Sequence, residues 1–227
     1  MDKRYRQVVS CKEMKEIEKK ADAEGLSYRQ MMENAGTAAA KVIFEESKDS
    51  FSDKANIVIF CGKGNNGGDG FVVGRYFLER NQNVTVVLAD GQPKTEDAIA
   101  NAAILSARGI SMIDTEKYPE LLFKAIENAN VIVDAIYGTG FHGSLKDTAR
   151  ICTKLINQKA KEEKSLVKNK IFSLDIPTGL NGDYGQPDID TVIADKTIVF
   201  HRLKPVHKLK EAIGFCGKII VVGIGIN

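Results

Sequence analysis

The sequence feature that most constrains this chain is a glycine-rich stretch over residues 56–75. It opens with an apolar run at 57–60 that is short and rich in β-branched and aromatic residues, as a buried strand is. Five glycines follow within residues 62–70, before an apolar-periodic segment that predicts a helix over 71–79. Glycine accepts positive φ and lets another group approach the main chain closely, so the stretch predicts a tight turn between a strand and a helix.

Polar residues within this turn indicate a ligand site. The first N–H groups of a helix have no internal partner and the helix dipole favours negative charge there, so a strand, a turn and a helix start can bind an anion. Asn65, Asn66 and Asp69 add amide and carboxylate oxygens, which can hold a cation and a polar ligand together. The glycine spacing matches the dinucleotide-binding pattern G-x-G-x-x-G, but the G-K-[ST] ending of a phosphate-binding P-loop is not present. A tight loop without a ligand is the alternative on these residues alone.

The whole chain has the composition of an ordinary globular protein. Its 227 residues are 43% apolar and 27% charged, and 32 basic against 30 acidic residues leave a formal charge of +2. This balance does not point to nucleic acid or a membrane surface as the principal partner. With no apolar stretch of membrane-spanning length and no apolar signal region, we expect a cytoplasmic protein. Reduced thiols, rather than zinc ligands or disulfides, are expected at the widely spaced Cys11, Cys61, Cys152 and Cys216.

Strand and helix patterns alternate along the rest of the chain. Two helices, each opened by a capping-box pattern at Ser10 and Ser27, precede the first strand. Further strands are predicted at 84–88, 110–113, 130–133, 170–174, 194–200 and 217–223. The alternation predicts a Rossmann-like three-layer α/β/α sandwich, with a mostly parallel sheet and helices on both faces. Because no repeat, low-complexity tract or linker divides the sequence, residues 1–227 are expected to form a single domain.

Two of these strands end in loops that carry a carboxylate. Asp134 follows the fourth predicted strand and opens a loop with three glycines and two hydroxyls that runs to Ser144. Asp175 follows the fifth and precedes Pro177 and Thr178, and a turn-capping aspartate beside a proline is the alternative for it. In an open α/β sheet, ligands bind beyond the carboxyl ends of the strands, where strand order reverses. We therefore expect both loops and the glycine turn to meet at one crevice.

Oxygen ligands from these loops suit a hard cation. Asn66, Asp134 and Thr178 would converge there, and their hardness suits an alkali or alkaline-earth ion better than zinc or copper. One carboxylate with neutral oxygens is a weak charge complement for a divalent ion.

Five motifs, in the same order along the chain, resemble those of the NAD(P)H-hydrate epimerases, the YjeF N-terminal-domain fold. The resemblance extends from Met14 to about Phe200, and its motifs are MENAG at 32–36, GNNGGDG at 64–70, VDAIYG at 133–138, DIPTG at 175–179 and ADKTIVF at 194–200. Thr178 stands where the family usually has serine, and either residue supplies a hydroxyl and a carbonyl. The chain resembles the stand-alone form, without the fused dehydratase that some relatives carry.

The resemblance implies an isomerase that repairs damaged nicotinamide nucleotides. The reaction would be epimerisation at C6 between the R and S forms of hydrated NADH or NADPH (NADHX or NADPHX), with a separate dehydratase acting on the S form. It further implies a homodimer and a potassium ion bound by Asn66, Asp134 and Thr178. Asp175 is our candidate for the acid/base group. The implied substrate-binding residues are Asn65, Asn66, Gly67, Gly68, Asp69, Gly138, Thr139, Gly140, Phe141, His142, Gly143, Ser144 and Asp175.

Two other functions remain open on the sequence. The chain could be a non-catalytic dinucleotide-binding or protein-interaction module on the same fold, since relatives include a protein known for binding an apolipoprotein. The oxygen-rich loops and both aspartates argue against this, because an idle site would not need them. A nucleotide-dependent transferase is the second alternative. Against it, the first loop offers no lysine beyond Lys63 that could bind a phosphate. His201 and His207 fall on no motif position and are expected to be ordinary polar residues.

Overall fold

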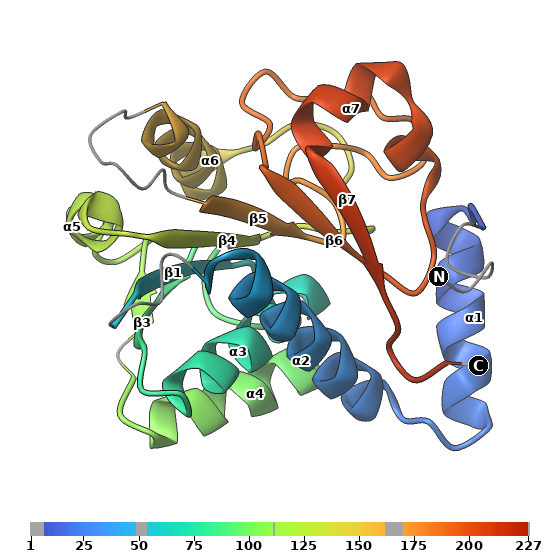
Figure 1. Cartoon of the computed structure of the whole chain (residues 1–227), viewed down its shortest axis with the longest axis horizontal. Helices are drawn as coiled ribbons and strands as arrows, with labels where there is room; N and C mark the ends of the chain where they lie inside the picture. The colour runs from blue at the N-terminus through green and yellow to red at the C-terminus, as the bar shows by residue number, and fades with distance from the viewer. Residues whose placement is uncertain (1–6, 49–53, 111, 162–169, 227) are drawn as a thin grey trace.

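The computed structural model describes residues 7–48, 54–110, 112–161 and 170–226, and its centre is a seven-stranded sheet (Figure 1). The strands lie in the order β3-β2-β1-β4-β5-β6-β7, and every neighbouring pair is parallel. This confirms the predicted Rossmann-like fold. The strands are β1 (Asn56–Cys61), β2 (Asn83–Leu88), β3 (Met112–Asp114), β4 (Val131–Ala135), β5 (Lys170–Leu174), β6 (Lys196–Phe200) and β7 (Lys218–Val222).

Helices cover both faces of the sheet and so make the three layers (Figure 1). Met31, Phe71 and Leu105 belong to the apolar core beneath one face, where α2, α3 and α4 pack. Leu122 and Ile156 belong to the core of the other face, which α5 and α6 cover. The helices are α1 (Cys11–Ala23), α2 (Tyr28–Glu46), α3 (Asn65–Leu78), α4 (Glu96–Ala107), α5 (Leu121–Glu127), α6 (Asp147–Ala160) and α7 (Lys210–Cys216), with a 3-10 turn η3 (Pro205–Lys208) before α7.

The glycine-rich turn is shorter, and its helix longer, than predicted. α3 begins at Asn65 rather than at residue 71, because glycine, asparagine and aspartate are poor helix formers that hide a helix start from sequence patterns. The expected use of positive φ is also wrong, since none of the glycines in this stretch adopts it. Close approach is what they provide: a Cβ on Gly62 would lie 2.0 Å from the carbonyl oxygen of Ile136. The end of β1 therefore packs directly on the loop that follows β4.

The motif at residues 32–36 is where α2 crosses α3. A Cβ on Gly36 would lie 2.4 Å from the Cβ of Val72, and one on Gly68 would lie 2.5 Å from the terminal methyl of Met32. Each helix thus offers a glycine to a side chain of the other. The motif therefore packs closely against the glycine stretch.

The two polar residues of this motif tie α2 to other elements. Glu33 forms an ion pair with Arg75 of α3. The side-chain amide of Asn34 donates to the carbonyl oxygen of Ile224 at 2.9 Å, in the segment that follows β7. The start of α3 is therefore held against a helix that is itself held to the C-terminal strand.

Smaller expectations also have clear outcomes. The capping box at Ser10 is complete, whereas Ser27 accepts a bond from the N–H of Gln30 without the reciprocal bond. The four cysteines are buried and free. Within the described part of the chain, no helix combines the length and apolar character that crossing a membrane requires.

We expect Gly36→Ala to lower the free energy of unfolding by about 1–3 kcal/mol, because the added methyl forces α3 away from α2. Gly214→Ala in α7 is the matched control, since a Cβ there meets nothing within 4 Å. Alanine at this helical position should stabilise the protein by about 0.5–1 kcal/mol. Urea unfolding followed by circular dichroism measures both variants, and equal stabilities would contradict the close helix crossing.

Candidate functional site

The three loops singled out in the sequence leave neighbouring strands at the same edge of the sheet. β1 pairs with β2 on one side and with β4 on the other, so the strand order reverses between β1 and β4. β5 is the next neighbour of β4. Such a reversal point, beyond the carboxyl ends of the strands, is where open α/β sheets bind ligands.

Asp134 is a buried carboxylate whose two oxygens accept four hydrogen bonds. Its Oδ1 accepts from the Thr178 hydroxyl at 2.6 Å and from the N–H of Ile136 at 3.3 Å. Its Oδ2 accepts from the N–H of Thr178 and from the Ser173 hydroxyl, both at 2.8 Å. Burial raises the pKa of Asp134, and the hydrogen bonds from Thr178 and Ser173 act in the opposite direction. Asp134 thereby joins the loop after β4 to the loop after β5.

Asn66, the third expected cation ligand, lies beside the loop that Asp134 opens. A Cβ on Gly138 would lie 3.3 Å from its Oδ1, while its Nδ2 is buried without a hydrogen-bond partner. Asp134 makes no ion pair with any described residue. The described residues also contain no group of three or more His, Cys, Asp or Glu side chains that could hold a metal ion. One buried, uncompensated carboxylate with neutral oxygens fits a monovalent cation better than a divalent one.

Asp175 is held in an uncommon backbone conformation by a buried ion pair. Its φ is +61°, in the left-handed region that few residues other than glycine adopt. Its Oδ1 accepts from the Lys204 ammonium at 2.6 Å and from the N–H of Phe200 at 3.2 Å. The side chains of Asp175 and Lys204 are 9% and 1% exposed. Such strain persists only where the surroundings over-determine it, and it gathers at functional sites.

His207 supports this ion pair from η3. Its Nδ1 accepts from the N–H of Lys204 at 2.9 Å, so its Nε2 carries the proton and donates to the carbonyl oxygen of Asp175 at 2.9 Å. Burial lowers the pKa of His207 to about 4, which keeps the ring neutral. The expectation that His207 is an ordinary polar residue is therefore wrong. His201 is buried as well. Lys204 was not singled out from the sequence, where a lone lysine after a strand carries no signal.

Two further carboxyl groups interact with the Asp175–Lys204 pair. Burial raises the pKa of Asp69 well above its usual range, and the charges of Asp175 and Glu18 raise it further. Burial also raises the pKa of Glu18 to about 7, with Asp175 adding to the rise and Lys204 and Lys15 opposing it. The charge of the buried Lys204 ammonium therefore acts on three carboxyl groups, those of Asp175, Asp69 and Glu18. The sequence did not single out Glu18, because ligand-binding residues were expected in the loops after strands and its helix precedes every strand.

The loop after β4 carries most of the other expected substrate-binding residues. Phe141 is buried and stacks on Tyr137, with ring centroids 5.4 Å apart. Asn181, from the loop after β5, donates to the carbonyl oxygen of Phe141 at 3.1 Å and contacts His142. The exposed members of this loop are Gly140, His142, Gly143 and Ser144. In α3, Asn65 is exposed, whereas Gly67, Gly68 and Asp69 are buried.

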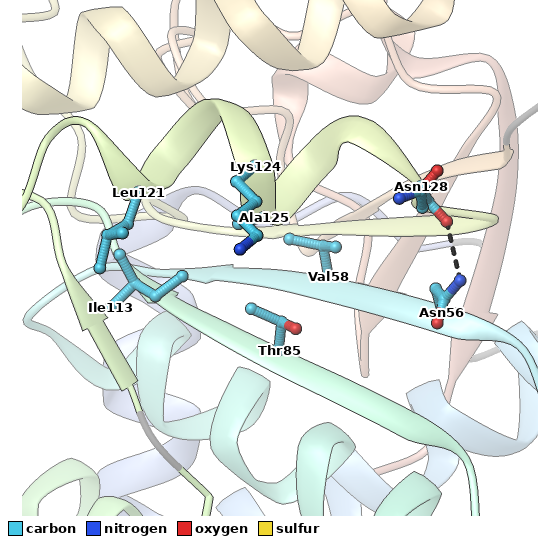
Figure 2. A pocket seen from close by; sticks show the side chains of 8 residues that line it. All are labelled: Asn56, Val58, Thr85, Ile113, Leu121, Lys124, Ala125 and Asn128. Carbon is cyan, nitrogen blue, oxygen red and sulfur yellow. Dashed lines mark hydrogen bonds between the residues drawn. The ribbon is translucent and has the colours of Figure 1, made fainter.

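A cavity of about 360 Å³ lies elsewhere, between α5 and the sheet (Figure 2). Figure 2 shows the Asn56 amide bonded to the carbonyl oxygen of Asn128, at 3.0 Å. Asn56 opens β1, so this end of the cavity lies opposite the edge that carries Asp134 and Asp175. Its lining has no carboxyl group and comprises Asn56, Val58, Thr85, Ile113, Leu121, Lys124, Ala125 and Asn128.

Comparisons with known proteins agree with this fold. The family described as YjeF-related protein N-terminus matches residues 28–206. A bifunctional NAD(P)H-hydrate repair enzyme Nnr from Methanothermobacter thermautotrophicus is 36% identical over 212 residues, which are 89% of this chain but only 37% of that relative. An NAD(P)H-hydrate epimerase from Nitrosopumilus maritimus is 34% identical over 210 residues, or 91% of each chain. The crystal structure of yeast ynu0 shares the fold, with a TM-score of 0.74 and 24% identity over 89% of this chain and 83% of that one.

The neutral ring of His207 should make folding stability fall in acid. In the unfolded chain the imidazole takes up a proton below its ordinary pKa of 6.5, whereas in the folded chain it does so only near 4. The stability contributed by this difference is present above 6.5 and is lost as the pH falls toward 4. At about pH 5 the loss amounts to about 2 kcal/mol.

We therefore expect the stability deficit of His207→Gln, measured by urea unfolding against the wild type, to shrink by about 2 kcal/mol between about pH 7.5 and about pH 5. Glutamine has no titrating ring, so the variant lacks this loss. The same deficit at both pH values would show that His207 is not buried as a neutral ring.

Proposed function

The chain belongs to the family described as YjeF-related protein N-terminus, and on that premise we propose that it epimerises hydrated NADH and NADPH at C6. The observation that carries the proposal is the buried Asp175–Lys204 pair beyond the carboxyl ends of β5 and β6, at the same sheet edge as the ends of β1 and β4. This pair puts a carboxylate beside loops shaped to take a dinucleotide. The near full-length match to a stand-alone epimerase supports the same reaction.

The chemistry of the substrate defines what the site has to supply. In the hydrate, water has added across the 5,6 double bond of the nicotinamide, so the C6 hydroxyl lies next to the ring nitrogen. When that oxygen is protonated, the C6–O bond breaks with both electrons, water leaves, and the nitrogen lone pair forms an iminium. Return of water to the other face, with loss of a proton, gives the other epimer. The site therefore needs a proton carrier and an anion near the ring.

Asp175 is the anion in this proposal. Its Oδ1 is occupied by Lys204 and by the N–H of Phe200, which leaves Oδ2 to face the ring. A carboxylate fixed in this way stabilises the iminium without having to reorient as the charge develops. The acid/base role that the sequence suggests for Asp175 stays a prediction.

Potassium is the cation that we propose for Asn66, Asp134 and Thr178. The burial of Asp134 without an ion-pair partner supports the proposal, as does the unbonded Nδ2 of Asn66, since reversing that amide would turn its oxygen inward. When bound, the ion would offset the charge of Asp134 and attract the diphosphate of a dinucleotide. The free N–H groups at the start of α3 would favour the same anion.

A separate dehydratase is the functional partner that we propose. The bifunctional Nnr relative is named for two activities, and this chain spans 37% of its length. A homodimer remains a prediction from the family resemblance, and a cytoplasmic location remains a prediction from the hydropathy of the sequence.

We expect purified protein in potassium buffer to convert the R epimer of NADHX to the S epimer well above the uncatalysed rate, and less well in sodium buffer. Chromatographic separation of the epimers follows the reaction. Asp175→Asn should slow it by about 100-fold or more. The surface variant Glu120→Gln is the control and should keep the wild-type rate. Tight binding of the substrate without acceleration in either buffer would instead favour the non-catalytic binding module.

Because Asp175→Asn leaves Lys204 buried without its partner, the variant can lose about 3–5 kcal/mol of stability. The double variant Asp175→Asn with Lys204→Met avoids this, since apolar replacement of a buried pair is often neutral. Full activity in the folded double variant would rule out the assigned role of Asp175.

The cation proposal has a readout that does not depend on activity. We expect potassium chloride to raise the melting temperature relative to choline chloride at equal ionic strength, because an ion that binds only the folded state stabilises it. Thr178→Val should abolish this difference. Thr197→Val is the matched control, since it also loses a buried hydroxyl bond, to Cys216, but leaves the expected cation ligands intact. An unchanged potassium effect in Thr178→Val would exclude this ion position.

A further inference from the structure

α1 presents one acidic side chain on its buried face. Cys11, Met14 and Ala21 are the buried residues of this helix. Glu18 lies between Met14 and Ala21 at helical spacing, on the same face. Its side chain is partly buried. It makes no hydrogen bond or ion pair with any described residue, so its carboxyl group is uncommitted.

The chain around α1 is anchored beside the Asp175–Lys204 pair. The N–H of Cys11 donates to the carboxylate of Asp183 at 2.8 Å, in the loop that follows Asp175. Just before the helix, the N–H of Val9 donates to the carbonyl oxygen of Leu203 at 2.9 Å, next to Lys204. These two contacts thus fix the start of α1 against the loop after β5 and the loop after β6.

The charged groups around Glu18 come from several elements. Asp69 on α3 and Asp175 after β5 are negative neighbours, Lys204 after β6 is the buried positive one, and Lys15 is a second cation on α1 itself. Burial and the charge of Asp22 raise the pKa of Tyr28, which opens α2, and the charge of Glu18 raises it further. Burial and the charge of Asp175 together raise the pKa of Glu18 to about 7, with both lysines opposing. A proton carrier works best with a pKa near the working pH.

We propose that Glu18 is a catalytic residue that carries the proton to and from the C6 oxygen, a role that rests on the proposed epimerase function. Protonated Glu18 gives its proton to the C6 hydroxyl, the C6–O bond breaks, and water leaves with the electron pair of that bond. A water then adds to the opposite face of the iminium and returns its proton to the Glu18 carboxylate. The cycle consumes no other reactant and regenerates the starting acid.

The other two carboxyl groups suit this role less well. Asp175 is committed to Lys204 and serves as the fixed anion. Asp69 is buried on α3, and burial raises its pKa well above the usual range. The three groups would therefore divide the work by environment, with Glu18, which has no hydrogen bond or ion pair with a described residue, as the proton carrier.

The test compares Glu18→Gln with Glu16→Gln, which removes an exposed carboxyl group from the same helix. In the wild type, kcat/KM for the R epimer should fall as the pH rises through about 7, after subtraction of the uncatalysed rate, because the protonated acid starts the reaction. Glu18→Gln should lower kcat by about 100-fold or more with little change in KM, and should lose that pH dependence. Its melting temperature should stay that of the wild type, and Glu16→Gln should behave as the wild type throughout.

The outcomes separate the two proposals. A wild type that does not accelerate epimerisation overturns the proposed function and this role with it. An active wild type with Glu18→Gln at full rate, or with the same fall through about pH 7, overturns the role of Glu18 alone. A purely structural role would show as a lower melting temperature with the pH dependence retained, and would overturn it too.

Discussion

The buried ion pair between Asp175 and Lys204 is the interaction on which the site depends. It joins the ends of β5 and β6, it holds Asp175 in a left-handed conformation, and His207 bonds to the backbone of both partners. A buried pair adds little net stability, yet loss of one partner costs about 3–5 kcal/mol. The role of the pair in this fold is therefore to hold the negative charge of Asp175 in a fixed position. Burial raises the pKa values of Asp69 and Glu18, and that charge raises them further.

Close helix packing is the second requirement, because it positions the other half of the site. Gly36 and Gly68 let α2 and α3 cross at contact distance, and Gly62 lets the end of β1 meet the loop after β4. The start of α3, with Asn66, is thereby fixed beside that loop. Sites built on rigid elements hold their geometry better than sites on free loops, so the glycine stretch acts through rigidity. An added methyl at such a position would disturb packing and site together.

Particular residues show where reasoning from sequence succeeded and where it failed. The alternation of strands and helices was enough to predict the fold, because each period reports which face an element buries. Asp134 near the end of β4 and Asp175 just after β5 were found because strand ends are local features. The start of α3 was missed because its first turns are made of poor helix formers. Lys204, His207 and Glu18 were missed because their importance lies in contacts with a residue distant in the chain.

The sequence by itself determined the layers, the parallel sheet and the edge at which the ligand loops gather, since these follow from local hydrophobic periodicity and from chain connectivity. Only the tertiary structure decided which groups share a charge environment. Asp175 lies 29 residues from Lys204 along the chain, and their pairing depends on β5 and β6 lying side by side. Burial and the nearness of other charges, which set the pKa of Glu18 and of His207, exist only after folding.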